Sequence, residues 1–193
     1  MKIYFVRHGK TQGNLEQRYN GIIDEPLVKD GIDELETRKD IYKDVKFDYI
    51  YCSPLTRCQQ TFAILFPNYQ VNEYRPDLVE MDFGSWAGIS YADKLKELES
   101  QGYTWNDYVD PENGETYESL FNRTTNFLEE IKAKHNSAET ILVLAHGLVI
   151  ASVMKKHFLP DEIMYFLSPD NGLGYIIDLN DNEVNIKKIA PLQ

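Results

Sequence analysis

Three apolar segments of this sequence end in polar side chains of the kinds that bind and attack anions. The segments 2–6, 48–52 and 140–145 are each followed within a few residues by cationic or titratable groups, namely Arg7, His8, Arg57 and His146. A guanidinium group can bind an oxyanion through two parallel hydrogen bonds. An imidazole with one nitrogen aimed at a bound phosphorus atom is a nucleophile. These residue types predict a phosphate site in which His8 attacks, while His146 and the arginines neutralise the phosphoryl oxygens.

A glycine follows each histidine, at Gly9 and Gly147. A residue without Cβ lets the backbone approach a ligand closely, and each glycine precedes an expected helix start or turn, where free N–H groups can hold an anion. A metal ion on His8 and His146 is the competing interpretation. Two arginines beside a dication would be electrostatically costly, and neither histidine has the spacing of a metal motif. We therefore expect no metal and no cofactor.

Transfer of a phosphoryl group leaves an alkoxide that needs a proton. A carboxylic acid with a raised pKa, near a pocket of low dielectric constant, could supply it. Glu80 and Asp82 are the candidates, because they alternate with apolar residues in the segment 78–88 and share one side of it if the backbone is extended. Their spacing alone does not choose between them.

The elements that must position these residues alternate between strands and helices. Strands are predicted over 2–6, 48–52, 69–74 and 140–145, with a final hairpin over 175–179 and 184–189 whose turn is N-D-N, 180–182. Helices are predicted over 30–45, 53–67, 90–101, 115–136 and 147–158, the second with Ser53 as N-cap and Pro54 as its first residue. The pattern is typical of an α/β fold, a three-layer α/β/α sandwich whose mostly parallel sheet has an antiparallel edge. The strand ends are then expected to converge on one crevice.

The length of 193 residues fits a single domain over 1–193, in which the long stretch of about 81–137 predicts an inserted cap. The net charge of −11 disfavours nucleic acid and anionic membranes as partners. No apolar segment approaches the roughly 20 residues of a membrane span, and no secretory signal opens the chain. The chain has only two cysteines, and together with the expected lack of a signal this favours reduced thiols in a cytoplasmic protein. We expect its partner to be a small-molecule substrate, and the protein to be a monomer or a homodimer.

Five motifs together resemble the histidine phosphatase superfamily, the phosphoglycerate-mutase-like proteins. They are R-H-G-K-T-Q-G-N, S-P-L-T-R-C-Q-Q-T, L-V-E-M-D-F-G-S-W-A-G, G-E-T-Y-E-S-L-F-N-R and L-V-L-A-H-G, in family order over residues 1 to about 150. The resemblance implies a phosphoglycerate-mutase-like fold, phosphorylation of His8, and Glu80 as the general acid that later activates water. It also implies a phosphate pocket of Arg7, Asn14, Arg57 and His146, with the Gly147 backbone nearby.

The middle motif looks most like the branch of broad-specificity and α-ribazole phosphatases. Ala87 departs from it, because many relatives have Glu in W-E-G, and this departure bears on the subfamily rather than on the chemistry. The resemblance therefore predicts a metal-independent phosphomonoesterase. The alternatives are a phosphoglycerate mutase and a binding module that has lost turnover.

The charges of the expected cap bear on these alternatives. A mutase must hold a second phosphate, yet residues 81–122 contain only two cations, Lys94 and Lys96, against about nine Asp and Glu. A module without turnover should lack part of the constellation, which is complete here. The cap is instead aromatic, and its rings either line the entrance or form the cap's own core. They are Trp86, Tyr91, Tyr103, Trp105, Tyr108 and Tyr117.

The remaining chemically capable residues have structural interpretations. His135 and His157 lie near the ends of charged helices and are predicted at the surface. Cys52 and Cys58 are predicted to pack in the interior. Two residues stay open. Asn171 either reaches the rim of the pocket or belongs to a glycine-rich turn, and Glu115 either orients an active-site arginine or starts a helix.

Overall fold

The computed structural model describes residues 1–104, 107–180 and 183–191, and its centre is one six-stranded sheet. The strand order is β3-β2-β4-β1-β5-β6, in which β3, β2, β4 and β1 are parallel, β5 pairs antiparallel with β1, and β6 pairs antiparallel with β5. The strands are β1 (Lys2–Arg7), β2 (Tyr49–Cys52), β3 (Glu73–Tyr74), β4 (Thr140–Ala145), β5 (Gly174–Asn180) and β6 (Glu183–Lys188). The prediction of a mostly parallel sheet with an antiparallel edge is confirmed. Part of the predicted hairpin turn, 181–182, lies outside the described residues.

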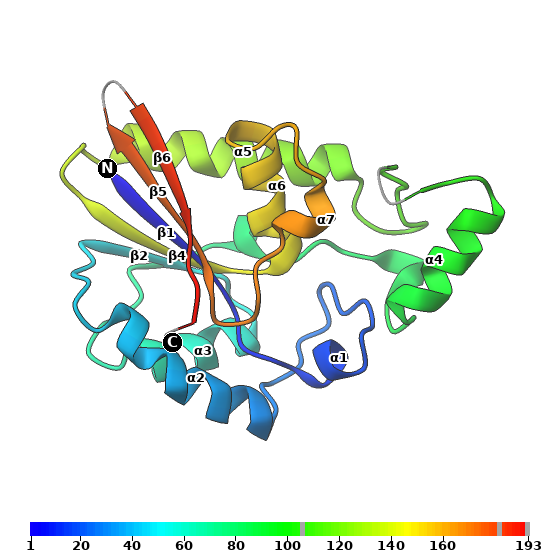
Figure 1. Cartoon of the computed structure of the whole chain (residues 1–193), viewed down its shortest axis with the longest axis horizontal. Helices are drawn as coiled ribbons and strands as arrows, with labels where there is room; N and C mark the ends of the chain where they lie inside the picture. The colour runs from blue at the N-terminus through cyan, green and yellow to red at the C-terminus, as the bar shows by residue number, and fades with distance from the viewer. Residues whose placement is uncertain (105–106, 181–182, 192–193) are drawn as a thin grey trace.

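Helices cover both faces of this sheet (Figure 1). They are α1 (Gln12–Leu15), α2 (Lys29–Tyr42), α3 (Thr56–Leu65), α4 (Tyr91–Ser100), α5 (Tyr117–Lys134), α6 (Gly147–His157) and α7 (Met164–Leu167). The short α1 and α7 were not predicted from the sequence. No helix among the described residues is long and apolar enough to cross a membrane.

Two separate apolar cores account for the three layers. Alternate residues of β1 point to opposite faces, so Phe5 packs with α5 and α6, while Val6 packs with α2 and α3. β4 divides in the same way, with Val143 in the first core and Leu144 in the second. Each of these four side chains is fully buried. The buried residues of β1 and β4, 3–6 and 141–145, are all apolar because both faces of these strands are covered.

The segment predicted as a cap, about 81–137, divides into two parts. The helix α5 belongs to the sandwich, because Leu120, Phe127 and Ile131 are buried in the core that it shares with the sheet. By contrast, α4 stands away from the layers (Figure 1). We therefore restrict the name cap to residues 84–116, from the 3₁₀ turn Gly84–Trp86 to the residue before α5.

Two details of the predicted elements are wrong. Helix α3 begins at Thr56 with Leu55 as its N-cap, so Ser53 does not cap it. The Ser53 hydroxyl lies instead 2.8 Å from His146 Nε2, in the interior. The predicted strand 69–74 pairs only over Glu73 and Tyr74.

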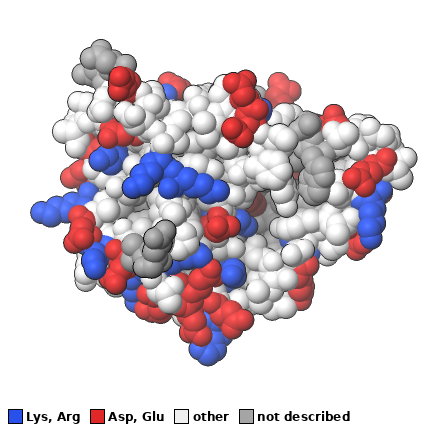
Figure 2. Space-filling model, in the orientation of Figure 1, with Lys and Arg blue, Asp and Glu red and all other residues white. Residues whose placement is uncertain are grey.

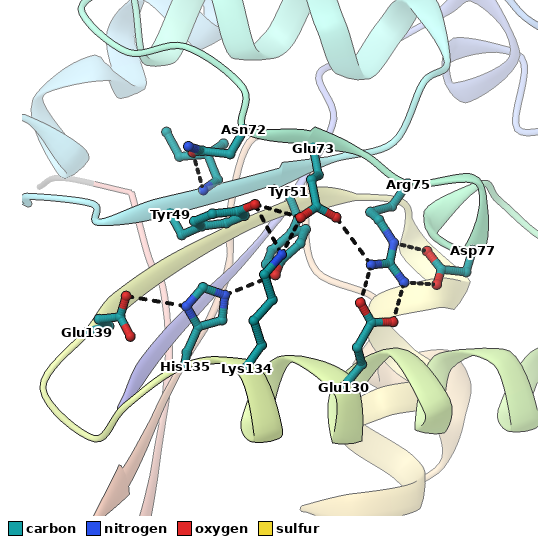
Figure 3. Close-up of polar contacts among 11 residues, drawn as sticks. Tyr49, Tyr51, Asn72, Glu73, Arg75, Asp77, Glu130, Lys134, His135 and Glu139 are labelled. Carbon is teal, nitrogen blue, oxygen red and sulfur yellow. Dashed lines mark hydrogen bonds and ion pairs between the residues drawn. The ribbon is translucent and has the colours of Figure 1, made fainter.

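His135 was predicted at the surface and is buried, with 8 % of its area exposed. The helix α5 ends just before His135. The His135 ring lies between two partners, with Nε2 2.9 Å from the Tyr51 hydroxyl and Nδ1 3.4 Å from Glu139 (Figure 3). Beside it, Lys134 of α5 pairs with Glu73 of β3, and Arg75, which follows β3, pairs with Glu130 of α5, so that two ion pairs join α5 to the edge strand of the sheet. His157 is half-buried, with Nε2 2.9 Å from Thr125 Oγ1, so it lies at the surface with its ring engaged rather than fully exposed.

Candidate active site

A cavity of about 420 Å³ opens at the carboxyl ends of β1, β2 and β4. Most of the predicted site residues line it, and these are Arg7, His8, Asn14, Arg57, Glu80 and Gly147. They come from five separate stretches of sequence. The parallel order of β2, β4 and β1 places the carboxyl ends of these strands side by side, and the five stretches meet there. Figure 2 shows the surface hollowed between the sandwich and the part that carries α4, with mostly uncharged atoms around the hollow.

His8 is mounted on the end of β1. Its backbone N–H donates to the Ala145 carbonyl at 3.0 Å, and the next N–H, of Gly9, donates to Thr61 Oγ1 at 2.8 Å. Its ring Nδ1 lies 2.6 Å from the Gly9 carbonyl oxygen. Because a carbonyl only accepts, Nδ1 carries the proton, and Nε2 is the nitrogen with a free lone pair.

Burial lowers the pKa of His8 well below the usual value of 6.5, and the nearby cations Arg57 and Arg7 lower it further. The imidazole is therefore neutral at neutral pH. A neutral ring with a fixed tautomer has the protonation state that a nitrogen nucleophile requires.

Arg57 is almost fully buried, with 1 % of its area exposed. Its Nη1 and Nη2 donate to the carbonyls of Ile23 and Gly21 at 2.8 and 2.7 Å, and its Nε donates to His146 Nδ1 at 3.3 Å. These three bonds fix the guanidinium of Arg57, which also lines the cavity. The loop that holds it, around Gly21, was not predicted to take part.

His146 does not line the cavity but lies behind Arg57, with none of its area exposed. Its two ring nitrogens face Arg57 Nε and the Ser53 hydroxyl, and its ring centre lies 5.1 Å from that of His8. Burial, together with Arg57, lowers the pKa of His146 well below its usual value. A neutral Nδ1 that accepts from Arg57 orients that guanidinium.

Arg7 lies across the N-terminus of α6. Its Nη1 donates to the Pro169 carbonyl at 2.8 Å and to Ser168 Oγ at 3.3 Å, whereas its buried Nε has no hydrogen-bond partner among the described residues. Buried polar groups are nearly always paired, so this N–H is available to a ligand. A Cβ on Gly147 would come within 3.4 Å of that Nε and 2.6 Å of Ser168 Oγ, which explains why glycine starts α6.

Glu80 and Asp82, which the sequence left open, take different places. Glu80 lines the cavity, and its Oε2 accepts from the N–H of Leu148, in the first turn of α6, at 3.2 Å. Asp82 does not line the cavity, and its Oδ1 accepts from Gly84 N–H at 2.9 Å, so that it stabilises the turn that starts the cap. Of the two carboxylates, only Glu80 stands beside His8 in the cavity.

The outer wall of the cavity is aromatic and apolar. Of the six aromatic residues predicted in the cap, four line it, namely Trp86, Tyr91, Tyr108 and Tyr117. Tyr103 is exposed and does not line it, and Trp105 lies outside the described residues. Several wall residues were not predicted, including Tyr19, Phe83, and Met164, Tyr165 and Phe166 of α7.

The rings of the wall also pack on one another. Tyr19 contacts Phe83, Trp86 and Tyr91 edge to face, with centroids 4.6, 5.5 and 4.7 Å apart. Both interpretations of the aromatic residues therefore hold together, since the rings form a small core and one side of it faces the cavity. Burial raises the pKa of Tyr91, so its hydroxyl stays protonated as a hydrogen-bond donor.

The cysteines and Glu115 have structural surroundings away from the cavity lining. Cys52 and Cys58 are both free and buried, and burial raises the pKa of the Cys58 thiol to about 12, which leaves no thiolate to act as a nucleophile. Glu115 accepts from Arg123 Nε and Nη2 at 2.6 and 2.8 Å, and Arg123 does not line the cavity. Glu115 therefore orients an arginine of α5 rather than one of the site.

The lowered pKa of His8 predicts how activity depends on pH. Protonation removes the lone pair of Nε2, so the acidic limb of kcat/KM that is due to His8 should lie well below pH 6.5. We expect kcat/KM to stay level from pH 7.5 to below 6.5, after correction for the second ionisation of the substrate phosphate near pH 6. A limb centred at pH 6.5 or above in the corrected profile would contradict a buried, neutral His8 beside two arginines.

Comparison with known proteins gives a consistent result. Residues 3–190 match the model of the histidine phosphatase superfamily (branch 1). The chain is 28 % identical over 192 residues to an adenosylcobalamin/alpha-ribazole phosphatase of Escherichia coli, covering 97 % of this chain and 94 % of that protein. It is 29 % identical over 200 residues to a 2,3-bisphosphoglycerate-dependent phosphoglycerate mutase of Rhizobium rhizogenes, covering 97 % and 94 %. A solved alpha-ribazole phosphatase of Shigella flexneri superimposes with a TM-score of 0.82 at 27 % identity, over 98 % of this chain and 96 % of that one.

Proposed function

The chain belongs to the histidine phosphatase superfamily, branch 1, and from this premise we propose that it is a metal-independent phosphomonoesterase that acts through a phosphohistidine at His8. The observation that carries the proposal is the state of His8 in the cavity. Its Nδ1 proton is held by the Gly9 carbonyl, its pKa is lowered, and Glu80, Arg7 and Arg57 line the same space.

In the first step, Nε2 of His8 attacks the phosphorus of a bound phosphomonoester, and the bond from phosphorus to the ester oxygen breaks. Arg7, Arg57 and the amide of Asn14 bind the phosphoryl oxygens, and the N-terminus of α6 adds its positive end. The leaving oxygen takes the proton of the protonated Glu80 carboxyl group, so an alcohol departs. His146 supports this step through the orientation of Arg57.

In the second step, water attacks the phosphorus of phosphohistidine. Glu80, now a carboxylate, accepts a proton from that water, and the bond from phosphorus to Nε2 breaks. Inorganic phosphate leaves, and His8 and the protonated Glu80 are restored. One carboxyl group thus serves as acid and then as base, as a stepwise displacement requires.

The distribution of charge in the cavity favours hydrolysis over a mutase reaction. The only Lys or Arg side chains among its described lining residues are Arg7 and Arg57, which belong to the single phosphate site. The cap lysine Lys94 pairs with Glu97 and lies 5.2 Å from the Trp86 ring centre, and a carboxylate, Asp107, lines the outer wall. A second phosphate would meet no cation there.

The histidines of the site are also engaged in ways that do not suit a metal. Both ring nitrogens of His146 have protein partners, and Nδ1 of His8 is bonded to the Gly9 carbonyl oxygen. Arg7 and Arg57 stand where a dication would add like charge. These contacts support chemistry by the side chains alone.

The outer wall supports a class of substrate. Aromatic and aliphatic side chains there would bury a planar or apolar leaving group, whereas a heavily charged one would lose its hydration without gaining a partner. We therefore propose phosphomonoesters with one terminal phosphate and a largely apolar or aromatic remainder.

The test is a panel of phosphomonoesters assayed with EDTA present. The panel holds aryl phosphates, alpha-ribazole 5′-phosphate, nucleotides, sugar phosphates and 3-phosphoglycerate, with mutase activity measured in parallel. We expect release of phosphate unaffected by EDTA, with kcat/KM for aromatic esters about 10-fold or more above that for sugar phosphates. Interconversion of phosphoglycerates without release of phosphate would overturn the proposal in favour of a mutase.

A further inference from the structure

The loop 168–172, between α7 and β5, is built against the back of the phosphate site. Gly172 N–H donates to the carbonyls of Arg7 and His8 at 2.8 and 3.2 Å, and Arg7 Nη1 donates to the Pro169 carbonyl. The loop is held in turn by the Tyr42 hydroxyl, which donates to the Gly172 carbonyl at 2.8 Å. The loop 168–172 is therefore hydrogen-bonded to the backbone of the proposed nucleophile, His8, and to the side chain of Arg7.

Asn171 is the one side chain of this loop that joins two parts of the site. Its Nδ2 donates to the His8 carbonyl at 2.9 Å and to Asn14 Oδ1 at 3.4 Å. An amide nitrogen has two hydrogens, so both bonds can form at once. Asn171 is 8 % exposed and does not line the cavity, so any effect on a substrate must pass through another residue.

The residue through which it acts is Asn14, whose amide must point in one direction to be useful. The N–H of Thr11 donates to Asn14 Oδ1 at 3.0 Å, and the Thr11 hydroxyl lies 3.2 Å from the same atom. Because a backbone N–H only donates, the atom that faces it is the oxygen. Nδ2 of Asn14 is then the end left for the cavity, where it offers two N–H donors to an anion.

From these contacts we infer that Asn171 is a positioning residue for phosphate binding, which fixes the Asn14 amide with its donors toward the anion and ties that amide to the backbone of His8. The inference rests on the proposed phosphatase function. Without Asn171, the Asn14 oxygen keeps only its Thr11 partners, and the amide samples orientations that present an oxygen to the phosphate. An acceptor that faces an oxyanion opposes binding.

A structural role alone would give a different result. If Asn171 served only to hold the loop 168–172, its removal would lower stability and leave phosphate affinity unchanged in the folded protein. The measurement is therefore the affinity for inorganic phosphate, by calorimetric titration, together with KM and kcat for an aryl phosphate. Thermal unfolding of each variant records the stability separately.

The test is a double-mutant cycle with Asn171→Ala, Asn14→Ala and the pair. We expect Asn171→Ala to weaken phosphate binding and to raise KM by about 5- to 30-fold, with a smaller change in kcat. In the Asn14→Ala background, the same change should weaken phosphate binding by less than about twofold, because its target is gone. Asn171→Ser, which is too short to reach Asn14, should behave like Asn171→Ala and serves if the alanine variant does not fold.

The control is Asn72→Ala. Asn72 is likewise bonded to the backbone, where its Oδ1 accepts from Ile50 N–H at 2.9 Å, but it lies beside the edge strand β3 (Figure 3). It should change stability and not phosphate affinity. Equal phosphate affinity in wild type and Asn171→Ala, or fully additive losses in the cycle, would overturn the inference. Absence of phosphate binding and turnover in the wild type would instead contradict the proposed function.

Discussion

Replacement of His8 by alanine is expected to lower kcat by about 10⁴-fold or more, because the variant lacks the nitrogen that we propose accepts the phosphoryl group. Its Nε2 is the free nitrogen of a ring fixed through Nδ1 to the Gly9 carbonyl. The other histidine of the site, His146, lies behind Arg57 with both nitrogens engaged, so it cannot replace His8. The variant should still bind inorganic phosphate, since Arg7, Arg57 and Asn14 remain.

The measurement is rapid quenching with a ³²P-labelled phosphomonoester. Wild-type protein should carry label that is lost in acid and kept in base, as expected for a phosphoramidate, and His8→Ala should carry none. His157→Ala is the matched control, because His157 is half-buried at the end of α6 beside Thr125 and does not line the cavity. Near-normal turnover by His8→Ala, or equal labelling of both proteins, would rule out His8 as the nucleophile.

The part of the site that could be predicted from the sequence is the part that follows from strand ends. The runs 3–6 and 141–145 are apolar without interruption, which a strand covered on both faces requires, and the polar residues directly after them must then lie at the carboxyl ends of the parallel strands. Arg7, His8 and Gly147 follow from this geometry. Glu80 follows only from the resemblance, because its place depends on the path of an irregular segment.

What could not be predicted depends on partners that are distant in sequence. Ser53 before Pro54 has the pattern of a helix N-cap, yet its hydroxyl is taken by His146, 93 residues away, and the helix starts later. His135 has the pattern of an exposed residue after a charged helix, but Tyr51 offers it a buried hydroxyl. In both cases a tertiary hydrogen bond decided the outcome against a local preference.

The aromatic wall and the loop 168–172 illustrate a second limit. Tyr19 and the residues of α7 have no periodicity or motif that sets them apart, and the motif that contains Phe83 does not mark it as a wall residue; they meet because the chain brings them to the same cavity. Asn171 stands in a sequence typical of a turn, and its contact with Asn14 spans 157 residues. Specificity and fine positioning are thus less visible in the sequence than the residues proposed to react.

Replacement of Glu80 by glutamine is expected to slow turnover by about 10²- to 10⁴-fold for alkyl phosphates and far less for p-nitrophenyl phosphate in the first step. An alkoxide leaves only if it is protonated, whereas p-nitrophenolate is stable without a proton. The glutamine amide keeps the size of the side chain. Its oxygen can still accept the hydrogen bond that Leu148 N–H donates to Glu80 Oε2 at 3.2 Å in the wild type. The other carboxylate oxygen, Oε1, accepts from Met81 N–H at 3.0 Å, so the change removes the proton and one of these two backbone bonds.

The second step makes this prediction sharper, because it also uses Glu80. With p-nitrophenyl phosphate, the glutamine variant should form phosphohistidine quickly and lose it slowly, which gives a burst of p-nitrophenol of about one equivalent per His8, followed by a slow steady rate. Asp82→Asn is the matched control, since Asp82 belongs to the same segment, does not line the cavity and accepts from Gly84 N–H through Oδ1. It should show neither the burst nor the dependence on leaving group. If Glu80→Gln slowed both esters equally and gave no burst, Glu80 would be acting on binding rather than on proton transfer.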